Sequence, residues 1–310
     1  MENLGSDQAQ RHFDPPEVFL RRRRHHADAL FSVLSELPDL VLLTGMQGNI
    51  GDHLIWEGTV DLLTCGGLRW RELRVEEITA SMPPGGTLVV PGSGAFHKFW
   101  HEWLPGALLE AARHFDRVVV LASSFDPQVK EVGELLSRSN VYAFARELRS
   151  YEAIKHFGRA MVSFDPALYF ADFDDKALAT MAEAPPSARV ASSYRERAVP
   201  SFLRCDEGSV LGQNGLLPNP ETNLDISLTS GDLTDFLNAI RGQDLVITDR
   251  LHVAVASIML GKTVTYLDPY DAKISEYLAF VFGGSVAPHV SQCEIPWLLD
   301  RELVVAAAAS

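Results

Sequence analysis

Short apolar segments recur along the chain, and most are followed by a polar or glycine-containing turn and then by a helical pattern. Near-continuous apolar runs of this kind are typical of strands in a parallel sheet, because helices cover both faces of such a sheet. Repeated strand–helix units predict an α/β fold. We expect strands at residues 40–43, 87–90, 118–121, 141–145, 160–164, 245–248 and 263–267.

The units form a longer series followed by a shorter one, which predicts two α/β domains. We expect an N-terminal arm, two domains and a C-terminal tail or helix at residues 1–26, 27–170, 171–290 and 291–310, respectively. The many turn-forming residues between 200 and 230 predict a long loop. Two sheets that face each other would place a ligand at the carboxyl ends of the strands of both.

The composition indicates a globular protein without a membrane-spanning segment. Hydrophobic residues make up 46% of the 310, and no apolar run approaches the roughly 18 residues of a spanning helix. The polar N-terminus lacks the apolar core of a signal peptide. Cys65, Cys205 and Cys293 lie far apart, so they predict neither a disulfide framework nor a metal site. We therefore expect a protein of the reducing cytoplasm.

The net charge of −14 argues against a broad positive field, so we expect no nucleic-acid partner. A small anion stays compatible with that charge, because a buried pocket sets its own potential. The basic run Arg21–Arg24 has two interpretations. It can be a solvated helix face or arm, or it can contact anionic lipid headgroups at the inner membrane face. The sequence leaves this peripheral membrane contact and the formation of a homo-oligomer open.

Two glycine-containing turns follow predicted strands and precede predicted helices. The first runs from Gly45 to Asp52, and the second contains Gly94. Glycines let the backbone approach a ligand closely, and free N–H groups at a helix start favour an anion. Gly51 and Gly94 are therefore candidate ligand-binding residues. Asn49 and Asp52 are candidates too, with a turn held by Asn49 and a helix cap formed by Asp52 as the simpler alternatives.

Arg146 and Lys273 each follow a predicted strand, where α/β folds place ligand-binding residues. The arginine fork can hold a carboxylate or a phosphate at two points. The alternative for Arg146 is a surface cluster with Glu147, and the alternative for Lys273 is an exposed lysine at a helix start. With the motif described next, these side chains predict a locally cationic cleft inside an acidic protein.

The sharpest motif joins an apolar strand to an apolar helix through Asp249, Arg250, Leu251 and His252. Three ionisable groups at such a junction are costly to bury without partners or a role. Arg250 can bind an anion, His252 can transfer a proton or donate to an oxyanion, and Asp249 can orient either of them. A satisfied salt-bridge network at the helix start is the alternative.

The chain contains neither the Gly-x-Ser-x-Gly elbow of a serine hydrolase nor the His-Glu-x-x-His motif of a zinc protease. The absence of these motifs argues against both activities. We expect neither a metal nor a cofactor.

Taken in order, these segments resemble the polysaccharide pyruvyl transferase family. The segments that carry the resemblance are Gly48–Asp52, Ala145–Glu147, Ser150–Tyr151, Asp165–Ala167, Thr248–His252, Gly261–Lys262 and Lys273–Ile274. The resemblance implies two Rossmann-like domains facing a cleft in a GT-B-like arrangement, with parallel sheets and helices on both faces. It also implies phosphoenolpyruvate as donor, a sugar or lipid-linked oligosaccharide as acceptor, and a pyruvate ketal as product.

In that family an Arg-Leu-His step and a second arginine contact the donor. Carried over to this chain, these donor-binding residues are Arg250, Leu251, His252 and Arg146. We expect His252 to act as an acid or to stabilise phosphate, and Asp249 or Asp52 to orient the reacting groups. Asn49, Gly51, Gly94 and Lys273 complete the expected donor site.

Two other functions stay open. A GT-B-type glycosyltransferase could use a nucleotide sugar on the same architecture, although no clear pair of spaced glutamates for a ribose pocket appears near residues 250–280. A non-catalytic binding or scaffold protein could also keep this fold. The family often has three glycines where this chain has Pro91–Gly94, which keeps the second alternative open, whereas the intact Asp249–His252 motif argues against it.

Overall fold

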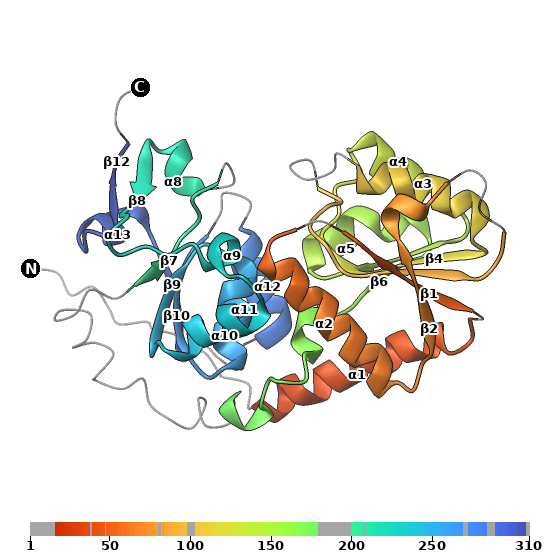
Figure 1. Cartoon of the computed structure of the whole chain (residues 1–310), viewed down its shortest axis with the longest axis horizontal. Coiled ribbons are helices and arrows are strands. Elements are labelled where there is room, and N and C mark those ends of the chain that lie inside the picture. Colours follow the sequence, from red (N-terminus) through yellow and green to blue (C-terminus); the bar gives the residue numbers. More distant parts are fainter. Residues whose placement is uncertain are drawn as a thin grey trace, which may run out of the picture.

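The computed structural model describes most of the chain. The described residues are 16–37, 39–46, 48–79, 82, 84–97, 103–178, 200–206, 209–268, 272–283 and 289–307. Within them the polypeptide forms a six-stranded sheet, a four-stranded sheet and a two-stranded sheet, with helices packed around the larger two (Figure 1).

The larger sheet is parallel throughout, with the strand order β2-β1-β3-β4-β5-β6. Its strands are β1 (Leu40–Thr44), β2 (Trp70–Arg74), β3 (Thr87–Val90), β4 (Arg117–Ser123), β5 (Val141–Ala145) and β6 (Ala160–Val162). The five strands predicted for this part of the chain are confirmed. β2 was not predicted, because it is an edge strand in which only Leu73 is buried.

Helices cover both faces of this sheet, because alternate residues of its strands point to opposite sides. One face packs against α1 (Pro16–Leu34) and α2 (Ile50–Cys65). The other packs against α3 (Leu104–His114), α4 (Lys130–Leu136) and α5 (Leu148–Ile154). Short 3-10 turns also occur, at η1 (Val75–Glu77), η2 (Lys155–Phe157) and η3 (Pro166–Tyr169).

The start of α1 corrects the expected N-terminal arm. The helix begins at Pro16, so residues 16–26 are helical and pack on the rest of the molecule. Phe19 is 1% exposed, and Arg22 donates hydrogen bonds to the carbonyls of Phe280 and Val281. Arg23 pairs with Asp175 at 2.7 Å. Two of the four arginines of the basic run, Arg22 and Arg23, therefore make contacts within the protein.

The second sheet is also parallel, with the order β11-β10-β9-β7. Its strands are β7 (Ser201–Phe202), β9 (Leu245–Thr248), β10 (Thr263–Leu267) and β11 (Val290–Cys293). The strands predicted at 245–248 and 263–267 are confirmed. Around them lie α8 (Val210–Gln213), α9 (Ile226–Thr229), α10 (Leu233–Arg241), α11 (Leu251–Met259), α12 (Lys273–Phe282) and α13 (Ile295–Leu299).

Two expectations for the part of the chain after residue 200 need correction. The stretch at 200–230 is not one long loop, because it contains β7, α8, α9 and the short strand β8 (Leu216–Pro218). The C-terminal tail or helix expected from residue 291 does contain the helix α13, but its boundary cuts through β11 and it also includes β12 (Val304–Ala306), which pairs antiparallel with β8. These elements are only two to four residues long, too short to show a clear periodicity in the sequence. β8 becomes a strand by pairing with β12, which is distant in the sequence.

The six-stranded sheet and the four-stranded sheet, each with its helices, form the two halves of the molecule. The largest hydrophobic cluster joins these halves. Ile50, Leu54 and Ile55 of α2 pack with residues of α10, α11 and α12 in one continuous core. Figure 1 accordingly shows α2, α11 and α12 between the two main sheets. A close approach of α2 to η3 requires Gly58, because a Cβ there would lie 2.1 Å from the Pro166 carbonyl oxygen. This contact holds the middle of α2 against η3.

Candidate functional site

The strand order of the larger sheet reverses its direction between β1 and β3. The chain connects outward from β1 to β2 on one side and continues through β3 to β6 on the other. Open α/β sheets bind ligands at such a point, outside the carboxyl ends of the strands. The turns that leave β1 and β3 carry Gly51 and Gly94, so two predicted residues lie at this position.

The start of α2 is closed by its own side chains. Asn49 is the N-cap, and its Oδ1 accepts a hydrogen bond from the Gly51 N–H at 2.8 Å. The Asn49 N–H in turn donates to Asp52 Oδ2 at 2.9 Å, which completes a capping box. Both side chains thus have the capping contacts that were the simpler alternative, and a ligand-binding role for them stays a prediction.

Gly51 brings the starts of two helices from different halves together. A Cβ at this position would lie 2.8 Å from His252 Nδ1 and 2.9 Å from His252 Cβ. Only glycine therefore lets the imidazole of His252 rest against the first turn of α2. His252 belongs to α11 of the second half, so this contact joins two segments that are far apart in the sequence.

Arg146 follows β5 and is buried, with 1% of its surface exposed. Its Nη1 pairs with Asp165 Oδ2 at 3.2 Å, and its Nε donates to Ser124 Oγ at 2.9 Å and lies 3.5 Å from Glu147 Oε2. The Glu147 carboxylate also accepts hydrogen bonds from the hydroxyls of Ser124 and Ser150. The surface cluster considered from the sequence is therefore an internal ion-pair network.

Asp165 links this network to the second half of the chain. It is fully buried, and its Oδ2 lies 3.5 Å from His252 Nε2. Burial opposes the ionisation of this carboxyl, yet its contacts with His252 and Arg146 hold its pKa below the usual value. Asp165 was not among the predicted site residues. Its position after β6, at the carboxyl edge of the sheet, was the available signal.

Lys273 completes the group from the first turn of α12. A Cβ built at Gly94 would lie 3.8 Å from both Lys273 Nζ and Arg146 Nη2, so the two cations approach the same glycine. We call the residues that meet here the interface site: Gly51, Gly94, Arg146, Asp165, His252 and Lys273. They come from both halves of the chain.

Arg250 lies in a different group. Its Nε donates to Asp225 Oδ1 at 2.6 Å, and its Nη2 pairs with Asp225 Oδ2 at 2.5 Å and with Asp206 Oδ2 at 2.8 Å. Two carboxylates thus neutralise the guanidinium that we expected to bind the donor. Arg146 is also ion-paired, so carboxylates balance both arginines that we expected to make the cleft cationic.

Asp249 lies close to the Arg250 group. Its side chain is 2% exposed, and its Oδ1 accepts from the Arg204 N–H at 2.7 Å, whereas its Oδ2 has no hydrogen-bond partner among the described residues. Burial raises the pKa of Asp249 to about 7, although Arg204 and Arg250 oppose the shift. Leu251 points into the hydrophobic core, at 8% exposure.

The backbone at the start of α11 offers a different kind of anion site. The helix begins at Leu251 with Arg250 as N-cap, and the Arg250 side chain makes no capping hydrogen bond. The first N–H groups of a helix have no partner within the helix, and the helix dipole favours negative charge beside them. The neighbouring starts differ, because Asn49 caps α2 and Asp268 accepts from the Ile274 and Ser275 N–H groups of α12.

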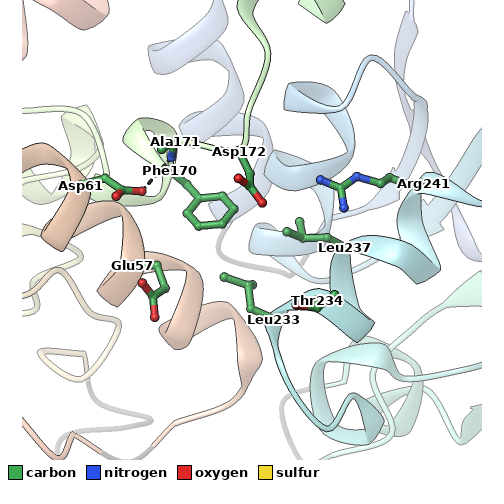
Figure 2. Close-up of a pocket in the computed structure, with 9 residues that line it drawn as sticks. All are labelled: Glu57, Asp61, Phe170, Ala171, Asp172, Leu233, Thr234, Leu237 and Arg241. Carbon is green, nitrogen blue, oxygen red and sulfur yellow. Dashed lines mark hydrogen bonds between the residues drawn. The ribbon is translucent and has the colours of Figure 1, made fainter.

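A surface pocket of about 360 Å³ lies elsewhere, between α2, the segment after η3, and α10 (Figure 2). Its lining residues are Glu57, Asp61, Phe170, Ala171, Asp172, Leu233, Thr234, Leu237 and Arg241. Asp61 accepts a hydrogen bond from the Ala171 N–H at 2.7 Å, and the Phe170 ring faces the centre (Figure 2). Three carboxylates against one guanidinium do not suit a dianion, and none of the predicted site residues lines this pocket.

Among the described residues no group of three His, Cys, Asp or Glu side chains could hold a metal ion. No helix in the described parts of the chain combines the length and apolar character needed to cross a bilayer.

Comparison with known proteins gives one family. The model of the family described as polysaccharide pyruvyl transferase matches residues 49–270, which is more than half of the chain and includes every residue of the interface site except Lys273. No curated protein matches the chain.

Among solved structures, an uncharacterized protein from Klebsiella pneumoniae has a TM-score of 0.64 at 18% identity, with 87% of this chain and 98% of that chain covered. It supports the α/β fold. A protein described as sugar binding from Salmonella typhimurium matches at 11% identity, with 88% and 94% covered and a TM-score of 0.33. Tagatose-6-phosphate ketose/aldose isomerase from Escherichia coli matches at 11% identity, with 88% of each chain covered and a TM-score of 0.32.

Proposed function

The chain belongs to the polysaccharide pyruvyl transferase family, and we propose that it transfers the pyruvyl group of phosphoenolpyruvate to a sugar. The acceptor would be a residue of an exopolysaccharide or another cell-surface glycan precursor, free or lipid-linked, and the product a pyruvate ketal. The observation that carries the proposal is the interface site, where the start of α11 with His252, Lys273 and one edge of Arg146 meet near the carboxyl ends of the strands of the larger sheet.

The donor carries a phosphate and a carboxylate, so it needs at least two positively polarised contacts. We place one anionic group at the start of α11, where the side chain of the N-cap residue Arg250 makes no capping hydrogen bond to the first N–H groups. We place the other beside Gly94, where Lys273 Nζ and Arg146 Nη2 each lie 3.8 Å from the position that a Cβ would take. In this arrangement Arg250 does not touch the donor: its pairs with Asp206 and Asp225 hold the N-cap of α11 in position.

The same placement gives the two sheets separate tasks. We propose that they act as two domains in a GT-B-like arrangement, with the donor between them. The larger sheet supplies Gly51, Gly94 and Arg146, and the second half supplies His252 and Lys273. Because these groups come from both sides, a small relative movement of the halves would open or close the site.

The reaction requires one proton donor and two attacking hydroxyls. Protonation of the methylene carbon of phosphoenolpyruvate makes its central carbon electrophilic, and one sugar hydroxyl then forms a C–O bond to it. The C–O bond to phosphate breaks, and a second hydroxyl closes the ketal. The two hydroxyl protons balance the proton taken up by carbon and the one taken up by phosphate. His252 is suited to the proton transfers, because Asp165 Oδ2 faces its Nε2 at 3.5 Å.

The proposed place of action is the cytoplasm, where phosphoenolpyruvate is available as a soluble metabolite. Arg21 and Arg24 are exposed on α1, so they could meet anionic lipid headgroups if the acceptor is lipid-linked. Arg22 and Arg23 make contacts within the protein, which leaves only half of the basic run for such a surface.

The proposal is tested by incubating the purified protein with phosphoenolpyruvate and a panel of nitrophenyl hexosides and N-acetylhexosaminides. Phosphate release is measured together with the mass of the product, which should gain one pyruvate less one water. Removal of a general acid or base typically lowers a rate by about 10²–10⁴-fold, so we expect His252→Ala to lose activity by that factor.

His53→Ala is the matched control, because His53 is an exposed histidine on α2, next to the interface site in sequence. It should keep the wild-type rate. A wild-type protein that shows no phosphate release with any acceptor and no binding of phosphoenolpyruvate would contradict the function. Equal rates for His252→Ala and wild type would instead contradict the assignment of His252 alone.

A further inference from the structure

The hydroxyl of Tyr277 is buried without a hydrogen-bond partner. The side chain is 0% exposed, and its oxygen contacts no donor or acceptor among the described residues. A buried polar group in this state is costly, and native proteins rarely keep one without a reason. Tyr169, by contrast, donates its hydroxyl to the Arg23 carbonyl at 2.9 Å.

Tyr277 lies on the helix that carries Lys273 of the interface site. It lies one helical turn after Lys273 on α12, so both side chains are on the same face of that helix. α12 packs against α5, which directly follows Arg146 and Glu147. Besides burial, the charges of Asp165 and Glu147 raise the pKa of Tyr277 and that of Arg146 lowers it, which agrees with a position near the buried network.

The chemistry of the hydroxyl suits an anionic ligand. Burial, and next the negative charge of Asp165, raises the pKa of Tyr277 above its usual value, so the phenol keeps its proton at neutral pH. A neutral phenol can donate one hydrogen bond, and a carboxylate or phosphate oxygen is a strong acceptor. We propose that Tyr277 is a further donor-binding residue, whose hydroxyl donates to an oxyanion held by Lys273 and Arg146 in the interface site.

This inference rests on the proposed donor, but it makes a separate prediction about the empty protein. Because the hydroxyl has no partner before ligand binds, Tyr277→Phe should leave the melting temperature of the ligand-free protein unchanged or raise it. Removal of a hydroxyl whose hydrogen bond stabilises only the folded protein would instead lower the melting temperature. Tyr169→Phe is the matched control, because it removes a hydroxyl that has a partner, and it should lower the melting temperature.

The binding of phosphoenolpyruvate and of inorganic phosphate is measured by calorimetry for wild type, Tyr277→Phe and Tyr169→Phe. A hydrogen bond to a charged group predicts about tenfold to a hundredfold weaker binding of at least one ligand to Tyr277→Phe. Tyr169→Phe should bind both as wild type does. If Tyr277→Phe binds both ligands normally, or if its ligand-free melting temperature falls as that of Tyr169→Phe does, the proposal is overturned.

The outcome separates this inference from the proposed function. Wild-type turnover with normal ligand binding by Tyr277→Phe would refute the role of Tyr277 and leave pyruvyl transfer standing. If phosphate binding depends on Tyr277 but phosphoenolpyruvate is not turned over, the role of Tyr277 stands and pyruvyl transfer is refuted. A wild-type protein that binds neither ligand would refute both.

Discussion

Replacing Asp249 by asparagine should make the stability of the protein less dependent on pH. The Asp249 side chain is 2% exposed, and only one of its two oxygens has a hydrogen-bond partner among the described residues. Burial raises its pKa from the usual 3.8 to about 7, while Arg204 and Arg250 lower it and Asp225 adds to the increase. Asparagine has nearly the same shape and can still accept the Arg204 N–H, but it does not titrate.

The sign of the effect follows from proton binding. Between about pH 4 and about pH 7 the folded protein holds a proton on Asp249 that the unfolded chain has released. The stabilisation is therefore fully present below the unfolded pKa and is lost as pH rises through the folded pKa. Between pH 5 and pH 8 this loss is on the order of 3 kcal/mol. The variant should become more stable relative to wild type by that amount.

Urea unfolding followed by tryptophan fluorescence, at several pH values from 5 to 8, measures the free energy of unfolding of both proteins. Asp300→Asn is the control, because Asp300 is exposed, and its difference from wild type should stay constant across that range. A constant difference for Asp249→Asn as well would show that Asp249 keeps an ordinary pKa. A difference that shrinks as pH rises would refute the direction of the shift.

Two further substitutions test the packing around the site. Arg146→Met leaves the buried carboxylates of Asp165 and Glu147 without their cation, so it should lower the free energy of unfolding by about 3–5 kcal/mol in urea; an unchanged value would mean that the network is not formed. Gly58→Ala should cost about 1–3 kcal/mol or more, since its Cβ would lie 2.1 Å from the Pro166 carbonyl. Gly106→Ala, also within a helix but with nothing within 4 Å, should cost nothing.

The buried strands were predictable because their signal is local. Leu40–Leu43 and Val118–Leu121 are apolar throughout, and both form central strands of the larger sheet. β2 gave no such signal, since Trp70–Arg74 is polar on its exposed face and becomes a strand only by pairing with β1. The start of α1 was missed for a related reason: its arginines look solvated, but Arg22 and Arg23 find partners far along the chain.

The candidate site shows the same division. Turns and ionisable residues after strands were visible in the sequence, and Gly51, Gly94, Arg146, His252 and Lys273 do converge. The motif Asp249–His252 suggested that its charged groups act together. The structure separates them, because successive side chains at a helix start point in different directions, with Arg250 toward Asp225 and His252 toward Asp165.

Periodicity and turn chemistry act between near neighbours, so the alternation of strands and helices could be predicted from the sequence, as could the edge of the sheet at which polar groups gather. Which charges pair could not be predicted in this way. His252 meets Asp165 across 87 positions of sequence, and the Tyr277 hydroxyl is buried without a hydrogen-bond partner among the described residues. Such contacts depend on how the two halves pack, and that packing is set by the shared core of α2 with α10, α11 and α12.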